Sequence, residues 1–119
     1  MKKVLICEDD QSIQELLKEF LSKNDCEVDS ADNGKEAVSK AKSDNPELII
    51  LDIRMPKLNG LEVAAEIRKF NQQAKLVFLT GFQSPELRKE AQKYNISAYI
   101  VKSNSPKEVL RVIQGVLKD

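Results

Sequence analysis

The run Leu48-Ile49-Ile50-Leu51, which leads directly into Asp52, decides the fold class of this chain. Large apolar residues in unbroken succession are typical of a β-strand that is covered on both faces. Such strands belong to parallel sheets, because the crossover helices of a parallel sheet pack on both of its sides. The run therefore predicts a buried parallel strand with a carboxylate at its carboxyl end.

Four further apolar segments along the chain have the length of a strand. They are residues 4–7, 26–31, 76–79 and 98–101. Segment 26–31 is the most polar, so we expect it at an edge of the sheet. Between the strands, apolar residues recur with helical spacing, which predicts helices near residues 13–21, 35–42, 61–67, 84–93 and 105–117.

The first and the last of these helices carry the clearest signals. Apolar residues of the first helix follow the i, i+3, i+4, i+7, i+8 pattern of one buried stripe, which comprises Ile13, Leu16, Leu17, Phe20 and Leu21. The last helix begins at Ser105-Pro106-Lys107-Glu108, which has capping-box spacing and a proline at the first helical position. The first pattern indicates a helix that packs one face against a sheet, and the second marks the start of the last helix.

Strands and helices alternate strictly along the chain. This order predicts an α/β fold with right-handed crossovers and helices on both faces of the sheet. The simplest arrangement is a flavodoxin-like, doubly wound (βα)5 fold with a five-stranded parallel sheet of order 2-1-3-4-5. We expect one domain over residues 1–119, because this length leaves no room for two.

Composition excludes several classes of function. The 19 basic and 19 acidic residues cancel, so the chain lacks the positive surface that binds nucleic acid or an anionic membrane. No apolar run approaches the length of a membrane span, and there is no signal-peptide pattern. Cys7 and Cys26 both lie in strand-like segments, which indicates buried reduced thiols. We therefore expect a cytoplasmic protein without direct contact to nucleic acid or membrane.

Polar residues gather where the predicted strands end. Glu8, Asp9 and Asp10 follow the first strand, Asp52 follows the third, Thr80 ends the fourth and Lys102 follows the fifth. Sites in open parallel sheets form beyond the carboxyl ends of the strands, so these side chains are expected on one rim. Taken singly, each has an ordinary structural explanation, such as a turn residue, a strand-end hydroxyl or a solvated lysine. Their convergence favours a functional site.

The chemistry of this rim points to a metal ion and a phosphoryl group. Carboxylates a few ångströms apart repel, and a divalent cation resolves the repulsion. Oxygen ligands favour Mg²⁺, and Mg²⁺ beside an exposed carboxylate suits phosphoryl transfer to Asp52. Lys102 can offset phosphoryl charge, and the Thr80 hydroxyl can donate to a phosphoryl oxygen. Asp10 is nearest the following helix and is assigned to capping it, which leaves Glu8 and Asp9 as ligands.

The same residues carry a family resemblance. Four motifs, from residue 3 to about residue 117, resemble those of the receiver domains of two-component response regulators: Val4-Leu5-Ile6-Cys7-Glu8-Asp9-Asp10, Leu51-Asp52-Ile53-Arg54-Met55-Pro56 with Asn59-Gly60, Leu79-Thr80-Gly81, and Tyr99-Ile100-Val101-Lys102. The resemblance implies that Asp52 accepts a phosphoryl group from a partner's phosphohistidine. The sequence contains no histidine, so a histidine kinase or a histidine phosphotransfer protein must supply it.

The resemblance also assigns the remaining roles. It makes Asp9 the direct Mg²⁺ ligand, Glu8 a ligand through water, and Arg54 the donor of a main-chain carbonyl to the metal. It further implies a switch in which the Thr80 hydroxyl moves toward the phosphoryl group, Lys102 pairs with that group and the Tyr99 rotamer follows. The fourth helix, fifth strand and fifth helix would then bind a downstream protein. Such a chain catalyses its own phosphorylation and slow dephosphorylation and turns over no separate substrate.

Ser103 departs from the family pattern, in which proline usually follows the lysine and the peptide bond between the two is cis. A cis bond before a residue other than proline costs about 2.5–4 kcal/mol. We therefore expect either a strained cis 102–103 bond or a trans bond with a rearranged loop and Lys102 further from Asp52. Gly81 leaves open space beside Asp52, and Arg54 and Phe82 flank its entrance.

Other functions remain open to different degrees. The main alternative is a scaffold of the same fold that works without phosphorylation, although all of the key acids are present. A flavodoxin is disfavoured because Glu8-Asp9-Asp10 would repel a phosphate, and an aspartate-based phosphatase because Arg54 stands where its second aspartate is usual. The sequence leaves open the partner kinase, the output, and whether the chain acts alone or within a longer regulator.

Overall fold

The predicted sheet is present in the computed structural model, which describes residues 1–55, 57–81, 84–102 and 105–118. The strands are β1 (Lys2–Cys7), β2 (Cys26–Ala31), β3 (Leu48–Leu51), β4 (Lys75–Thr80) and β5 (Ala98–Val101). All pairings are parallel, in the order β2-β1-β3-β4-β5. Both the predicted strand order and the edge position of segment 26–31 are therefore confirmed.

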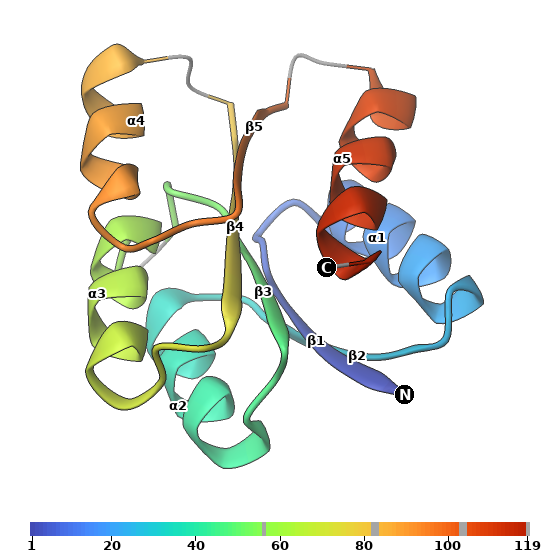
Figure 1. Cartoon of the computed structure of the whole chain (residues 1–119), viewed down its shortest axis with the longest axis horizontal. Coiled ribbons are helices and arrows are strands. Elements are labelled where there is room, and N and C mark those ends of the chain that lie inside the picture. The colour runs from blue at the N-terminus through green and yellow to red at the C-terminus, as the bar shows by residue number, and fades with distance from the viewer. Residues whose placement is uncertain (56, 82–83, 103–104, 119) are drawn as a thin grey trace.

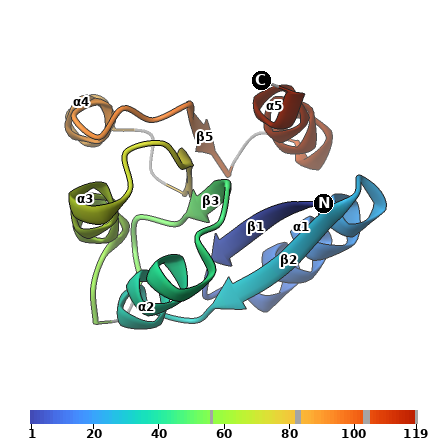
Figure 2. The same ribbon diagram turned by 60° about the horizontal axis from the view of Figure 1, so that its bottom comes forward.

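Helices cover the two faces of this sheet unequally. They are α1 (Gln11–Lys23), α2 (Gly34–Asp44), α3 (Gly60–Phe70), α4 (Pro85–Gln92) and α5 (Pro106–Lys118). Figure 1 shows α1 and α5 on one side of the strands and α2, α3 and α4 on the other. Figure 2, turned by 60°, shows the same two layers with β2 at the edge of the sheet. This is the doubly wound arrangement that the alternation predicts.

Strand β3 is buried on both faces, as its unbroken apolar run predicts. Leu48 and Ile50 pack in the hydrophobic cluster under α1 and α5, whereas Ile49 and Leu51 pack in the cluster under α2, α3 and α4. Each of the four is at most 1% exposed. Alternate side chains of β3 thus pack into different cores, and Asp52 comes directly after the last of them.

The predicted stripe of α1 is partly wrong. The buried residues of this helix are Gln14, Leu17 and Leu21, whereas Leu16 is 39% exposed. At about 100° per residue, Leu16 lies about 200° around the helix axis from the buried Gln14. The other predicted stripe residues are confirmed, because Ile13, Leu17, Phe20 and Leu21 all pack in the cluster under α1 and α5.

Two predicted helix caps are present. The Asp10 carboxylate accepts the N–H groups of Ser12 at 2.9 Å and Ile13 at 3.3 Å, so its assignment to capping is confirmed. Ser105 Oγ accepts the N–H of Glu108 at 3.3 Å, as in the first half of a capping box. The Glu108 carboxylate pairs with Arg111 at 2.7 Å. The capping contacts give Asp10 a role in α1 of its own, distinct from the roles predicted for Glu8 and Asp9.

Two further expectations concern the cysteines and the membrane. Cys7 and Cys26 are both buried free thiols, as predicted, and burial raises the pKa of each above its ordinary value. Within the four described ranges, no helix has the length and apolar character needed to cross a bilayer.

Candidate metal and phosphoryl-acceptor site

Three carboxylates meet at the carboxyl end of the sheet. Glu8 and Asp9 follow β1, and Asp52 follows β3, the strand paired with β1. The N–H of Asp52 donates to the carbonyl of Cys7 at 2.9 Å, which extends this pairing into the site. One carboxylate oxygen from each residue lies within 4.8 Å of the others. The predicted convergence of Glu8, Asp9 and Asp52 is therefore present.

Lys102, the residue directly after β5, joins this cluster. Its Nζ lies 2.8 Å from Glu8 Oε1 and 2.9 Å from Asp52 Oδ2, and its side chain is only 20% exposed. Burial alone would lower the pKa of Lys102, but the two carboxylates outweigh burial and raise it. The lysine is therefore a fixed cation between two acids.

Glu8 is the most enclosed of the three acids, at 1% exposed. Burial raises the pKa of its carboxyl from 4.5 to about 7, although the hydrogen bonds from Lys102 and from the Asp10 N–H oppose the shift. The nearby charge of Asp52 raises the Glu8 pKa further. The Glu8 carboxyl therefore binds its proton more tightly than the carboxyl of an exposed glutamate does.

Asp52 is buried rather than exposed, so that part of the prediction is wrong. Only 5% of the residue is accessible, and both its carboxylate oxygens are held from within the fold. Oδ1 accepts the main-chain N–H of Arg54 at 3.3 Å, and Oδ2 accepts from Lys102. These contacts fix the direction of the carboxylate.

Gly60, at the start of α3, lies against the main chain that carries Asp52. A Cβ atom built on Gly60 would come within 2.3 Å of the Asp52 carbonyl oxygen, and the N–H of Gly60 donates to the Ile53 carbonyl at 2.7 Å. No side chain fits in that space. The absence of a side chain at Gly60 lets α3 pack close enough to hold the loop after β3.

The remaining predicted residues surround this cluster. Thr80 ends β4 and is fully buried, and its carbonyl accepts the N–H of Lys102 at 2.7 Å. A Cβ atom on Gly81 would meet no described atom within 4 Å, and the predicted open space beside Asp52 stays a prediction. Tyr99 is half-buried, with its ring centroid 6.4 Å from that of Phe78 and 5.5 Å from the Arg88 guanidinium. The switching roles of Thr80 and Tyr99 stay predictions.

Two expectations fall on residues outside the described ranges. The 102–103 peptide bond involves Ser103, and the predicted entrance involves Phe82, and neither residue is described. Lys102 itself is described, and its Nζ contacts Asp52 directly, so the lysine is not displaced from the acid.

The donor set fits Mg²⁺. All three acids offer hard oxygens, which Mg²⁺ prefers over softer ligands. Glu8 Oε1 is buried and pairs with Lys102 Nζ at 2.8 Å. This oxygen retains lone pairs for a metal-bound water. The Arg54 carbonyl as a further ligand stays a prediction.

Known proteins resemble this chain over nearly its whole length. The family model of the response regulator receiver domain matches residues 4–114. The chemotaxis protein CheY of Halobacterium salinarum is 34% identical over 98% of this chain and 97% of its own length. The chain belongs to the receiver domain family. Receiver domains are the signalling switches of two-component systems, which confirms the family expected from the motifs.

Two further relatives show how this receiver domain compares with others. The regulatory protein PhoP of Bacillus subtilis is 32% identical over 98% of the chain, which spans about half (49%) of PhoP. TrrA from Thermotoga maritima, whose structure was solved in complex with Mg²⁺ and BeF, is 40% identical to this chain, and the two structures superpose with a TM-score of 0.83. The match covers 98% of this chain and 99% of TrrA. The fold is therefore that of CheY-like proteins.

Sequence reasoning missed one residue beside the site of this receiver domain. Gln14 lies in the buried stripe of α1 and is 3% exposed, and its Nε2 donates to the Glu8 carbonyl at 2.8 Å. A glutamine at i, with leucines at i+3 and i+7, was the available signal, because a polar residue in a core stripe needs a partner.

Proposed function

We propose that this receiver domain is a Mg²⁺-dependent switch that accepts a phosphoryl group on Asp52. The contact of Lys102 with Glu8 and Asp52, beside the clustered acids, is the observation that carries the proposal. A scaffold that never met a phosphoryl group would have no need to hold a half-buried lysine between two acids. Buried charges are expensive, and they persist where function requires them.

The chemical step is an in-line displacement at phosphorus. A carboxylate oxygen of Asp52 forms a bond to phosphorus while the phosphorus–nitrogen bond of a partner's phosphohistidine breaks, and the departing imidazole keeps the electron pair. Mg²⁺, held by Glu8, Asp9, Asp52 and the Arg54 carbonyl, would neutralise charge on the phosphoryl oxygens. Arg54 N–H and Lys102 orient the Asp52 carboxylate before the step.

The new phosphoryl group would redirect Lys102. In the present structure its ammonium group pairs with Asp52 Oδ2, and after phosphorylation the added oxygens offer it a stronger partner. The Lys102 N–H is bonded to Thr80, so the ends of β4 and β5 respond together. With the Thr80 hydroxyl and Tyr99, this change would alter the surface of α4, β5 and α5 that binds a downstream protein.

A phosphorylation assay tests this function. The chain is incubated with Mg²⁺ and a small acyl phosphate, and intact mass is measured. We expect one phosphoryl group to be added to the wild-type chain. None should be added when a chelator removes the Mg²⁺, and none should be added to Asp52→Asn. Asp44→Asn, an exposed carboxylate on α2, is the matched control and should be phosphorylated normally. If the wild-type chain takes up no phosphoryl group, the alternative of a phosphorylation-independent scaffold replaces this proposal.

The donor is proposed to be a histidine kinase or histidine phosphotransfer protein, and the output a protein contact without direct binding of nucleic acid. The extent of the receiver domain as residues 1–119 and a cytoplasmic location stay predictions. Incubation with a phosphorylated histidine protein, followed by transfer of label, tests the donor class.

A further inference from the structure

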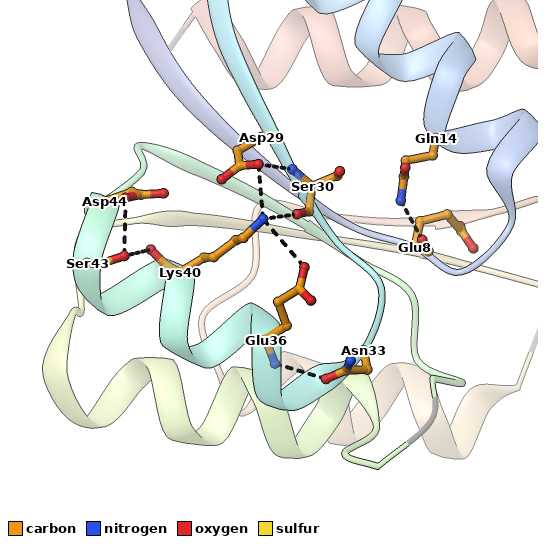
Figure 3. Close-up of polar contacts among 9 residues, drawn as sticks. All are labelled: Glu8, Gln14, Asp29, Ser30, Asn33, Glu36, Lys40, Ser43 and Asp44. Atoms are coloured by element: carbon orange, nitrogen blue, oxygen red, sulfur yellow. Dashed lines mark hydrogen bonds and ion pairs between the residues drawn. The ribbon is translucent and has the colours of Figure 1, made fainter.

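Gln14 is a buried polar residue that the chemistry above does not use. It is 3% exposed and shares the inner face of α1 with Leu17 and Leu21, both 0% exposed. Figure 3 shows its amide pointing from α1 toward Glu8. A leucine would suit such a position for packing alone, and a buried amide is tolerated where it satisfies a buried partner.

The partner of Gln14 is the main-chain carbonyl of Glu8, at 2.8 Å. The other polar groups of Glu8 are held too. Its N–H donates to Ala31 at 3.3 Å, Oε2 accepts the Asp10 N–H at 3.0 Å, and Oε1 pairs with Lys102. Gln14 therefore fixes the peptide group that links Glu8 to Asp9, the two acids assigned to the metal.

We propose that Gln14 is a positioning residue for the metal site, acting through the Glu8–Asp9 peptide. This inference rests on the proposed function, because it concerns how well the acids hold Mg²⁺. Without the amide donor, the Glu8 carbonyl is left unsatisfied inside the protein, and the peptide turns to find another donor. Rotation of that peptide moves the exposed Asp9 carboxylate out of the cluster that it forms with Glu8 and Asp52.

Gln14→Met tests the proposal because methionine has nearly the same length and lacks the donor. The matched control is Leu21→Val, which perturbs the same buried stripe without touching Glu8. Mg²⁺ affinity is measured by titration calorimetry on the full chain, and stability by urea unfolding. We expect Gln14→Met to bind Mg²⁺ about 10–100-fold more weakly, the usual effect of losing a group that orients a ligand. Leu21→Val should retain the wild-type affinity.

Two further readouts separate positioning from simple loss of structure. In the phosphorylation assay, Gln14→Met should need more Mg²⁺ for half-maximal rate, while the rate at saturating Mg²⁺ stays near that of the wild type. In the metal-free protein, NMR should show the Asp9 amide shifted or broadened in Gln14→Met and unchanged in Leu21→Val. Gln14→Leu repeats both measurements with a second donor-free side chain if the methionine variant does not fold.

An unchanged Mg²⁺ affinity in a folded Gln14 variant would overturn the inference, as would an equal loss in Leu21→Val. If the wild-type chain itself binds no Mg²⁺, the proposed function fails, and the inference falls with it. Wild-type binding with normal affinity in the Gln14 variants rejects the positioning role alone, so the two failures are distinguishable.

Discussion

Lys102 and Asp52 are 50 residues apart in sequence, and Lys102 Nζ lies 2.9 Å from Asp52 Oδ2. Strand β4 stands between β3, which precedes Asp52, and β5, which precedes Lys102. The lysine therefore reaches over the end of a whole strand to the acid, and it also contacts Glu8 at 2.8 Å. Such a cation stabilises the carboxylates of both acids. Under the proposed function, it would become available to a phosphoryl group on Asp52.

Replacing the lysine should separate metal binding from phosphoryl transfer. In Lys102→Ala, we expect the phosphorylation rate at saturating Mg²⁺ to fall about 10–100-fold, because the developing phosphoryl charge loses a fixed cation. Mg²⁺ affinity should be equal or tighter, because the amine no longer competes for Glu8 and Asp52. Stopped-flow or mass-spectrometric rates and calorimetry measure both quantities. Lys107→Ala, an exposed lysine at the start of α5, should change neither. Weaker Mg²⁺ binding in Lys102→Ala would contradict the competition.

The raised pKa of Glu8 predicts how stability depends on pH. The native chain without metal holds a proton on Glu8 up to about pH 7, whereas the unfolded chain releases it near 4.5. The native state thus binds more protons in this window, so its free energy of unfolding falls as pH rises through it, by about 1–3 kcal/mol. Urea unfolding in chelator at pH 5.5 and pH 8 measures the change. Glu8→Gln should remove most of it, and added Mg²⁺ should restore stability at pH 8. A free energy of unfolding that is the same at pH 5.5 and pH 8 in the wild type would count against the raised pKa of Glu8.

Asp9 and Asp10 are adjacent acids with separable roles. Asp10→Ala should lower the free energy of unfolding by about 1 kcal/mol, because two N–H groups at the start of α1 lose their acceptor. Its Mg²⁺ affinity should hardly change. Asp9→Asn should do the reverse and lose Mg²⁺ affinity with little change in stability. Asp10→Asn is the control for the cap, since asparagine caps about as well. Loss of Mg²⁺ binding in Asp10→Asn would place Asp10 among the ligands.

Gly60 and Gly115 form a matched pair of helical glycines. Gly60→Ala puts a Cβ atom 2.3 Å from the Asp52 carbonyl oxygen, a main-chain atom that cannot yield cheaply. We expect a loss of about 1–3 kcal/mol in stability and slower phosphorylation, because Asp52 is displaced. A Cβ atom on Gly115 meets nothing within 4 Å, so Gly115→Ala in α5 should stabilise the chain by about 0.5–1 kcal/mol. Urea unfolding compares the two variants, and tolerance of Gly60→Ala would refute the close approach.

Local pattern was sufficient for the elements and their order. The apolar run before Asp52 indicates a doubly covered strand because period and burial are properties of consecutive residues. Alternation of strands and helices then leaves few topologies, since crossovers are right-handed. Residues at strand ends, such as Glu8, Asp52 and Lys102, are brought to one rim by any parallel sheet, so their convergence was predictable without coordinates.

Tertiary packing decided which side chains are buried around the rim and which contacts they make. The exposure of a carboxylate depends on what packs over it, and Asp52 is only 5% exposed, with the Arg54 N–H and Lys102 bound to its two oxygens. The contacting face of α1 depends on how the helix docks, which left Leu16 exposed and buried Gln14.

The sequence by itself therefore determined the sheet, the order of its strands and the acids at their ends. Those features follow from periodicity and from chain connectivity. Only the tertiary structure decided that Gln14 holds the Glu8 carbonyl and that Lys102 pairs with Asp52. These contacts join residues through the finite reach of side chains across packed elements, which no local pattern of the sequence records.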